Sequence, residues 1–121
     1  MYLFPNGQAT ERVVRPRAMA LAADGSAGLQ DLTWDVWDSQ HAHATGTEWS
    51  SDCTPTCASG TVHRAPVTIT LSRPLEACGL EVFSSIRYVF PDGAARPMEP
   101  DEYTQTFATT AQSGDFAIVC G

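Results

Sequence analysis

The stretch Val67-Thr68-Ile69-Thr70-Leu71-Ser72 alternates apolar and hydroxyl side chains without interruption. In a β-strand, successive side chains point to opposite faces, so Val67, Ile69 and Leu71 share one face and the hydroxyls share the other. This pattern predicts a strand with one face in a core and one face toward solvent.

The same period of two extends to both sides of this stretch. Residues 79–90 form the next expected strand, with its apolar side chains on one face: Leu80, Val82, Ile86, Tyr88 and Phe90, with Ser84 among them. The segments 18–22 and 29–37 flank Asp24-Gly25-Ser26 and predict a hairpin. Further strands are expected at 41–50, 103–110 and 116–120, with turns at Pro91-Asp92-Gly93 and Gln112-Ser113-Gly114-Asp115.

Six to eight short strands with regular turns and no convincing helix favour one all-β domain over residues 1–121, an antiparallel β-sandwich. Residues 1–17 are expected to form an N-terminal arm or edge strand, and residues 95–102 a loop. The predicted core comprises Val67, Ile69, Leu71, Val82, Ile86 and Trp34.

The chain has four cysteines, an even number typical of two disulfides in a short β-rich protein. Cys53 and Cys57 lie on either side of Pro55, a spacing that favours a local bridge, and Cys78 then pairs with Cys120. A thioredoxin-like pair needs two intervening residues and a βαβ unit. A zinc site from Cys53, Cys57, His63 and Cys78 lacks the second close cysteine pair of a zinc ribbon.

Two disulfides predict a location outside the cytoplasm, with a signal peptide or lipoprotein leader removed ahead of residue 1. The 14 acidic residues exceed the 7 basic ones, all arginine, for a net charge of −7. This charge disfavours nucleic acid as a partner. No apolar run approaches the ~20 residues of a transmembrane helix, so we do not expect the chain to span a membrane.

The histidines offer the sharpest candidate for a metal site. His41 and His43 are two apart, so a strand would point both imidazoles to one face. No nearby acid or histidine has the parity to add a third ligand, and no segment matches a calcium-binding EF-hand loop. We therefore expect no metal and no cofactor.

Trp34 and Trp37 are three apart, which places them on opposite faces of a regular strand unless a bulge intervenes. Trp34 has the parity of Leu32 and Val36 and is expected in the core. Trp37 and Trp49 are expected at the surface, where tryptophans can stack on sugars or anchor a protein interface. With Asp35 and Asp38, they form the predicted binding surface. No nucleophile elbow, P-loop or dinucleotide motif is present, so no enzyme is expected.

Several segments together resemble small secreted or lipoprotein-like proteins of actinobacteria. The segments are Trp34-x-x-Trp37, Ala44-Thr45-Gly46-Thr47, Asp52-Cys53-Thr54-Pro55-Thr56-Cys57-Ala58-x-Gly60, Pro66 to Ser72 with Pro74, and Cys78-Gly79. The resemblance covers roughly residues 16–90. It implies export and life in the cell envelope or outside the cell, and it implies no catalytic residues.

These features predict a secreted or envelope-attached, non-catalytic binding module whose partner is an envelope polysaccharide or a protein. The alternative is a small secreted inhibitor of proteases or other hydrolases. Such an inhibitor presents a rigid loop, and Thr54-Pro55-Thr56 between Cys53 and Cys57 is the candidate.

Overall fold

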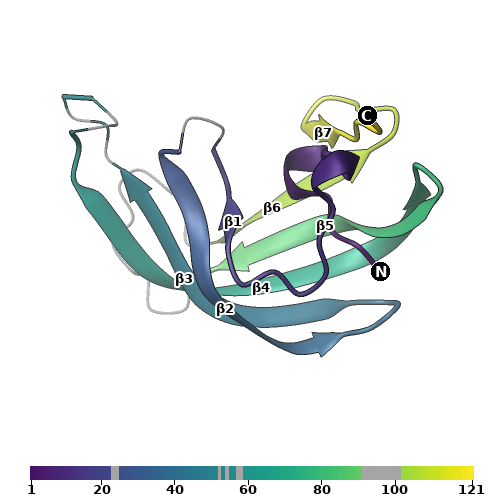
Figure 1. Cartoon of the computed structure of the whole chain (residues 1–121), viewed down its shortest axis with the longest axis horizontal. Helices are drawn as coiled ribbons and strands as arrows, with labels where there is room; N and C mark the ends of the chain where they lie inside the picture. The colour runs from purple at the N-terminus through teal and green to yellow at the C-terminus, as the bar shows by residue number, and fades with distance from the viewer. Residues whose placement is uncertain (23–24, 52, 54, 57–58, 91–101) are drawn as a thin grey trace.

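The protein is a single curled β-sheet with an N-terminal segment lying across its concave side (Figure 1). The computed structural model describes residues 1–22, 25–51, 53, 55–56, 59–90 and 102–121. Its elements are η1 (Pro5–Gly7), η2 (Ala9–Glu11), β1 (Met19–Ala20), β2 (Ala27–Trp37), β3 (Ala42–Ser51), β4 (Val62–Ala77), β5 (Leu80–Val89), β6 (Glu102–Ala108) and β7 (Asp115–Ala117).

The strands pair in the order of the sequence, from β1 to β7. All neighbouring pairs are antiparallel except β6 and β7, which run parallel. The described strands thus confirm the all-β class and the predicted hairpin of 18–22 with 29–37. The predicted turn at 91–93 lies outside the described residues, as does the predicted loop at 95–102 except for Glu102, which begins β6.

Local turn chemistry explains two of the hairpins. Between β4 and β5, Cys78 and Gly79 both have positive φ, 55° and 75°, as a two-residue turn of type I′ requires. Between β2 and β3, the Asp38 carboxylate accepts the backbone N–H groups of Gln40 and His41, each at 2.8 Å. An aspartate that binds the backbone ahead of it is a common way to close a turn.

The predicted sandwich is not what the described residues form. They contain one sheet, and the layer opposite it is residues 1–18 rather than a second sheet (Figure 1). The alternating pattern shows that each strand has one buried face, but it does not show what covers that face. A curled sheet with an irregular cover satisfies the same pattern.

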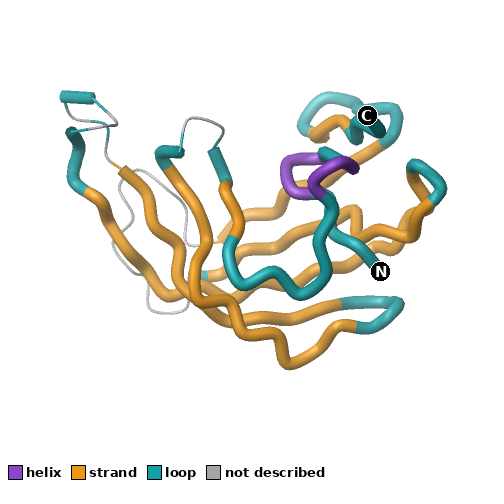
Figure 2. The backbone as a smooth tube through the Cα atoms, in the orientation of Figure 1, coloured by secondary structure: helices purple, strands orange, loops and turns teal. Residues whose placement is uncertain are grey.

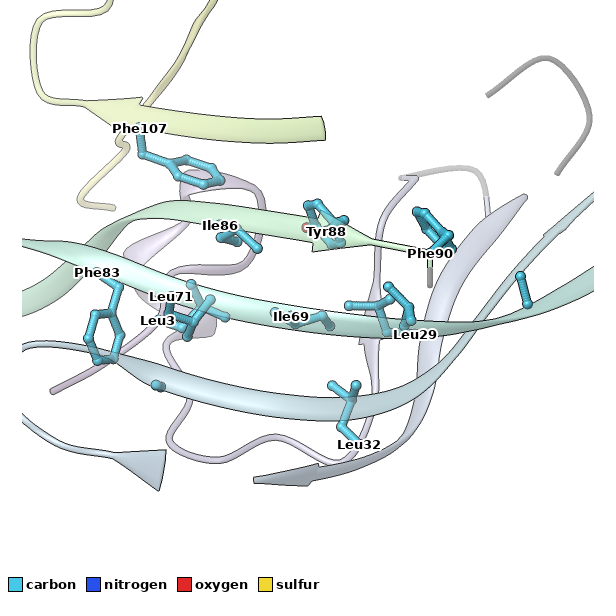
Figure 3. Packing of buried hydrophobic residues seen from close by; sticks show 13 residues of the cluster. Leu3, Leu29, Leu32, Ile69, Leu71, Phe83, Ile86, Tyr88, Phe90 and Phe107 are labelled. Atoms are coloured by element: carbon cyan, nitrogen blue, oxygen red, sulfur yellow. The ribbon is translucent and has the colours of Figure 1, made fainter. Parts of the chain in front are cut away.

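The core lies on the concave side of the sheet (Figure 3). Four predicted core residues, Val67, Ile69, Leu71 and Ile86, are at most 2% exposed, which confirms their assignment. The other buried members of this cluster are Leu3, Leu29, Leu32, Ala42, Ala65, Phe83, Tyr88, Phe90 and Phe107. Trp34 is partly buried against them. Val82 is also buried, in a second cluster with Phe4, Ala9 and Ala77.

The N-terminal segment is bonded to distant parts of the sheet. Tyr2 forms a parallel bridge to Val82 of β5, and Gln8 forms another to Val119. At its other end, the carbonyl of Arg17 accepts the N–H of Leu32 in β2, at 3.0 Å between N and O. Figure 2 shows the two short helices beside the C-terminal strand, on the open side of the sheet. The segment therefore connects both edges of the sheet.

The structure contains the predicted Cys78–Cys120 disulfide, which joins the β4–β5 turn to the C-terminus. Its two cysteines are 42 positions apart in the sequence. The Cys53–Cys57 bridge stays a prediction, because Cys57 lies outside the described residues.

Candidate ligand-binding surface

A bulge in β2 decides where its two tryptophans lie. Trp34 pairs with Ala44 and Val36 with His43, so Asp35 is an extra residue without a counterpart in β3. The extra residue reverses the alternation, and both indoles pack against the concave core. Their ring centroids are 4.8 Å apart in an edge-to-face arrangement.

The expectation that Trp37 lies at the surface is therefore wrong. Its indole is partly buried and contacts Phe83 edge-to-face, with 5.4 Å between ring centroids. Its Nε1–H donates to the carbonyl of Met1 at 3.2 Å, and that of Trp34 donates to the carbonyl of Pro16 at 2.7 Å. Both tryptophans thus fasten the N-terminal segment to the sheet.

Trp49 lies on the other, convex face of the sheet, because its neighbour Glu48 points into the core with 4% exposure. In the strand register, Trp49 faces Gly28 of β2 on one side and Arg64 of β4 on the other. A Cβ atom on Gly28 would lie 2.8 Å from the indole Cζ2. Only glycine leaves room for the indole to lie this close to β2.

A shallow, open hollow of about 440 Å³ lies beside this indole. Its lining residues are Ala18, Met19, Ala20, Leu29, Gln30 and Trp49. Most of these side chains are apolar, and Gln30 adds an amide that can donate and accept hydrogen bonds. An aromatic wall with an apolar floor and one polar group suits the flat face of a small polar ring.

Beyond the hollow, the convex face carries a series of threonine hydroxyl groups. Thr33, Thr45 and Thr68 lie side by side across β2, β3 and β4. In the next row toward the hollow, Thr47 pairs with Gln30. Both Thr33 and Thr45 are exposed, so these hydroxyls are accessible to a ligand that lies along the sheet.

The bulged residue Asp35 lies beside a histidine. Its Oδ1 is 2.6 Å from Nδ1 of His43. This hydrogen bond is the main reason that the pKa of Asp35 lies below its ordinary value of 3.8. Parity within one strand does not show the pair, because Asp35 and His43 lie on neighbouring strands whose register the sequence does not give.

Asp38 stabilises the β2–β3 turn. The N–H groups of His41 and Gln40 lower the pKa of its carboxyl, and its Oδ1 lies 3.5 Å from Nδ1 of His41. Its carboxylate is thus already engaged by the backbone of the turn.

One buried polar pair lies on the concave side. The Tyr88 hydroxyl donates to Oε1 of Gln105 at 2.8 Å. Burial, with smaller effects of Tyr103 and Glu48, raises the pKa of Tyr88 well above its ordinary value, so the phenol stays neutral. These groups are covered by the core and are inaccessible to a ligand in this arrangement.

The structure therefore does not bring the four predicted binding residues together. Trp49 lies beside the hollow, Asp35 lies further along β2, Asp38 lies in the turn, and Trp37 lies inside. The lining residues Ala18, Ala20 and Gln30 were missed, because only the strand register shows that they adjoin Trp49.

Within the described residues, no three or more histidines, cysteines, aspartates or glutamates are grouped as a metal ion would need. No helix in that part of the chain has the length and apolar character needed to cross a membrane.

Compared with protein-family models, curated proteins and solved structures, the chain matches none of them. A function for the protein has therefore to be inferred from the geometry of its convex face.

Proposed function

We propose that the protein is a non-catalytic module that acts outside the cytoplasm, in the cell envelope or secreted, and binds polysaccharide on its convex face. The observation that carries this proposal is the apolar hollow beside Trp49. The C–H face of a sugar ring stacks on an indole, while its hydroxyls bond to polar groups at the rim.

The surroundings of the hollow support a chain-like ligand. Gln30 and Thr47 pair across β2 and β3, and the row of Thr33, Thr45 and Thr68 follows. These side chains both donate and accept hydrogen bonds, as sugar hydroxyls do. A location outside the cytoplasm is supported by the Cys78–Cys120 disulfide, since disulfides persist in oxidising compartments.

The test is binding of the purified protein to bacterial cell-wall polysaccharide and to a panel of plant and bacterial polysaccharides, measured by affinity electrophoresis and calorimetry. We expect Trp49→Ala to lower the affinity about two- to tenfold, because stacking on one aromatic is worth about 0.5–1.5 kcal/mol. Its circular dichroism should match that of the wild type.

Two matched variants sharpen this test. Phe116→Ala removes another half-exposed aromatic, 43% exposed, from the far edge of the sheet and should leave binding unchanged. Gly28→Ala keeps Trp49 but forces its indole to move, and should weaken binding. Wild-type affinity in a folded Trp49→Ala protein, or no binding to any polysaccharide in the panel, would contradict the proposal.

The alternative function, inhibition of a hydrolase, gives a different result in a parallel assay. An inhibitor titrates a protease stoichiometrically, whereas a polysaccharide-binding module leaves every protease of a panel active. The candidate loop at 54–56 includes Thr54, which lies outside the described residues.

A further inference from the structure

We infer that the polysaccharide bound beside Trp49 is acidic and that Arg64 binds one of its carboxylates. This inference rests on the proposed function and narrows its ligand to glycans with uronic acids or other carboxylated sugars. Three observations carry it: Arg64 is next to Trp49, its guanidinium makes no ion pair with a described carboxylate, and the residues around it are neutral.

Arg64 is the direct cross-strand neighbour of Trp49. Side chains opposite each other in an antiparallel pair have Cβ atoms about 5 Å apart, and an arginine is long enough to reach past such a neighbour. Arg64 is exposed. Arg64 lies on the β4 side of Trp49 and the hollow on the β2 side, so its guanidinium can reach a neighbouring sugar of the polysaccharide whose ring stacks on the indole.

Within the described ranges, the guanidinium of Arg64 makes no ion pair with a carboxylate, unlike that of Arg87. Arg87, also on the convex face, bonds Oε2 of Glu102 at 2.8 Å. Arg12 lies over the ring of Tyr2, 5.9 Å from its centroid. None of the described carboxylates therefore competes with a ligand for the charge of Arg64.

The rows around Trp49 are otherwise neutral. Paired residues form rows across neighbouring strands. One row consists of Ala20, Gly28, Trp49 and Arg64, and the adjacent row consists of Gln30, Thr47 and Pro66. Neither row holds a carboxylate, although the whole chain carries −7. The nearest acid along β2 is Asp31, at the bulge after Gln30.

An arginine among neutral residues favours an anionic ligand over a neutral one. A chain of net negative charge repels polyanions in general, so an acidic glycan binds only where a cation faces it without competing carboxylates. Arginine suits this role, because its planar guanidinium binds both oxygens of a carboxylate at once.

The experiment compares each acidic polysaccharide with its own neutral form. Polygalacturonate, alginate and hyaluronan are used as such and after chemical reduction of their carboxylates to alcohols, which keeps the sugar linkages. We expect the wild-type protein to bind at least one acidic polymer about tenfold or more tightly than its reduced form, with an affinity that falls as salt rises.

Variants assign the difference to Arg64. Arg64→Ala should bring the affinity for the acidic polymer down to that for the reduced one, and Arg64→Lys should fall between them. Arg87→Ala is the matched control, since it removes a convex-face arginine already paired with Glu102, and it should bind like the wild type.

The outcomes separate the role of Arg64 from polysaccharide binding itself. Equal binding of acidic and reduced polymers that is lost in Trp49→Ala would overturn the role of Arg64 and leave polysaccharide binding intact. An equal loss in Arg64→Ala and Arg87→Ala would show a general charge effect and would also overturn it. Absence of binding to all six polymers overturns the acidic-glycan inference, and the wall-polysaccharide assay then decides the proposed function.

Discussion

The insertion of Asp35 in β2 determines which face of the sheet several nearby side chains occupy. As the bulged residue of β2, it lets Trp34 and Trp37 share the concave face and itself reaches His43 on the convex face. A second irregularity precedes Thr33, where Asp31 has a φ of 55°. Bulges add local twist, so two in one strand help the sheet to curl.

At the residue scale, we expect Trp37→Ala to lower the free energy of unfolding by about 3 kcal/mol, because its indole is packed against Trp34 and Phe83. Trp37→Phe keeps an aromatic ring but loses the hydrogen bond to Met1, at a cost of about 1 kcal/mol. Urea unfolding followed by circular dichroism measures both. Wild-type stability of the alanine variant would place the indole in solvent.

The Asp35–His43 contact gives a prediction for pH. The lowered pKa of Asp35 means that its contribution to stability is present above pH 3.8 and is lost as the pH falls through the folded-state value. His43→Ala should move the Asp35 pKa up toward 3.8. Carbon NMR of the carboxyl groups measures this titration.

Asp38 is the internal control for that titration. Backbone N–H groups are the main cause of its lowered pKa, so His43→Ala should leave its titration unchanged. A parallel shift of both aspartates would indicate a change of the whole hairpin rather than loss of one hydrogen bond.

At the scale of the elements, β4 is the longest strand, from Val62 to Ala77, and it pairs along most of its length with β3 and β5. Its inward side chains lie in the middle of the core. The alternating pattern is clearest in this strand because residues 62–71 pair with β3 without a bulge.

We expect Ile69→Ala to destabilise the fold by about 2–5 kcal/mol, since the side chain is 0% exposed and its removal leaves a cavity. Thr68→Ala, on the opposite face of the same strand, is the matched control and should cost much less. Chemical denaturation compares the two. A loss below about 1 kcal/mol for Ile69→Ala would contradict its burial.

Regular strands could be predicted from the sequence, and irregular ones could not. Expected strands at 41–50 and 79–90 correspond to β3 at Ala42–Ser51 and β5 at Leu80–Val89. In β2, the same period of two predicts Trp37 outside, whereas the bulge at Asp35 turns its side chain to the core. A period of two carries no information on where one residue is inserted.

At the scale of the whole molecule, the N-terminal segment and the disulfide hold the same corner together. Ala9 N–H donates to the carbonyl of Val119 at 2.9 Å, and Val119 N–H donates to that of Gly7 at 2.8 Å. The neighbouring Cys120 is bound to Cys78. The cover of the core thus depends on the C-terminus.

Replacing Cys78 and Cys120 together by serine should lower the free energy of unfolding by about 2–4 kcal/mol, because the bridge closes a long loop. Hydrogen exchange should become much faster at the amides of Ala9 and Val119 than at Ile69 in the central strand. Uniformly faster exchange at all three would show that the corner does not open by itself.

The site was less predictable than the fold. Trp49 could be selected from its residue type, but Ala18 and Gly28 matter only because β1 and β2 bring them beside it. The single-sheet architecture could not be predicted either, because residues 1–18 have no strand pattern that would indicate a covering layer.

The partners of the N-terminal segment have a consequence for the order of folding. β2 to β6 each pair with the strand next in the sequence, so hairpins can form locally and early. Tyr2 and Gln8, by contrast, form bridges to residues far along the chain, Val82 and Val119. The N-terminal segment, although made before the strands, is therefore placed after them. Until then the apolar concave face of the sheet is exposed to water, and the unfinished protein is most prone to aggregate.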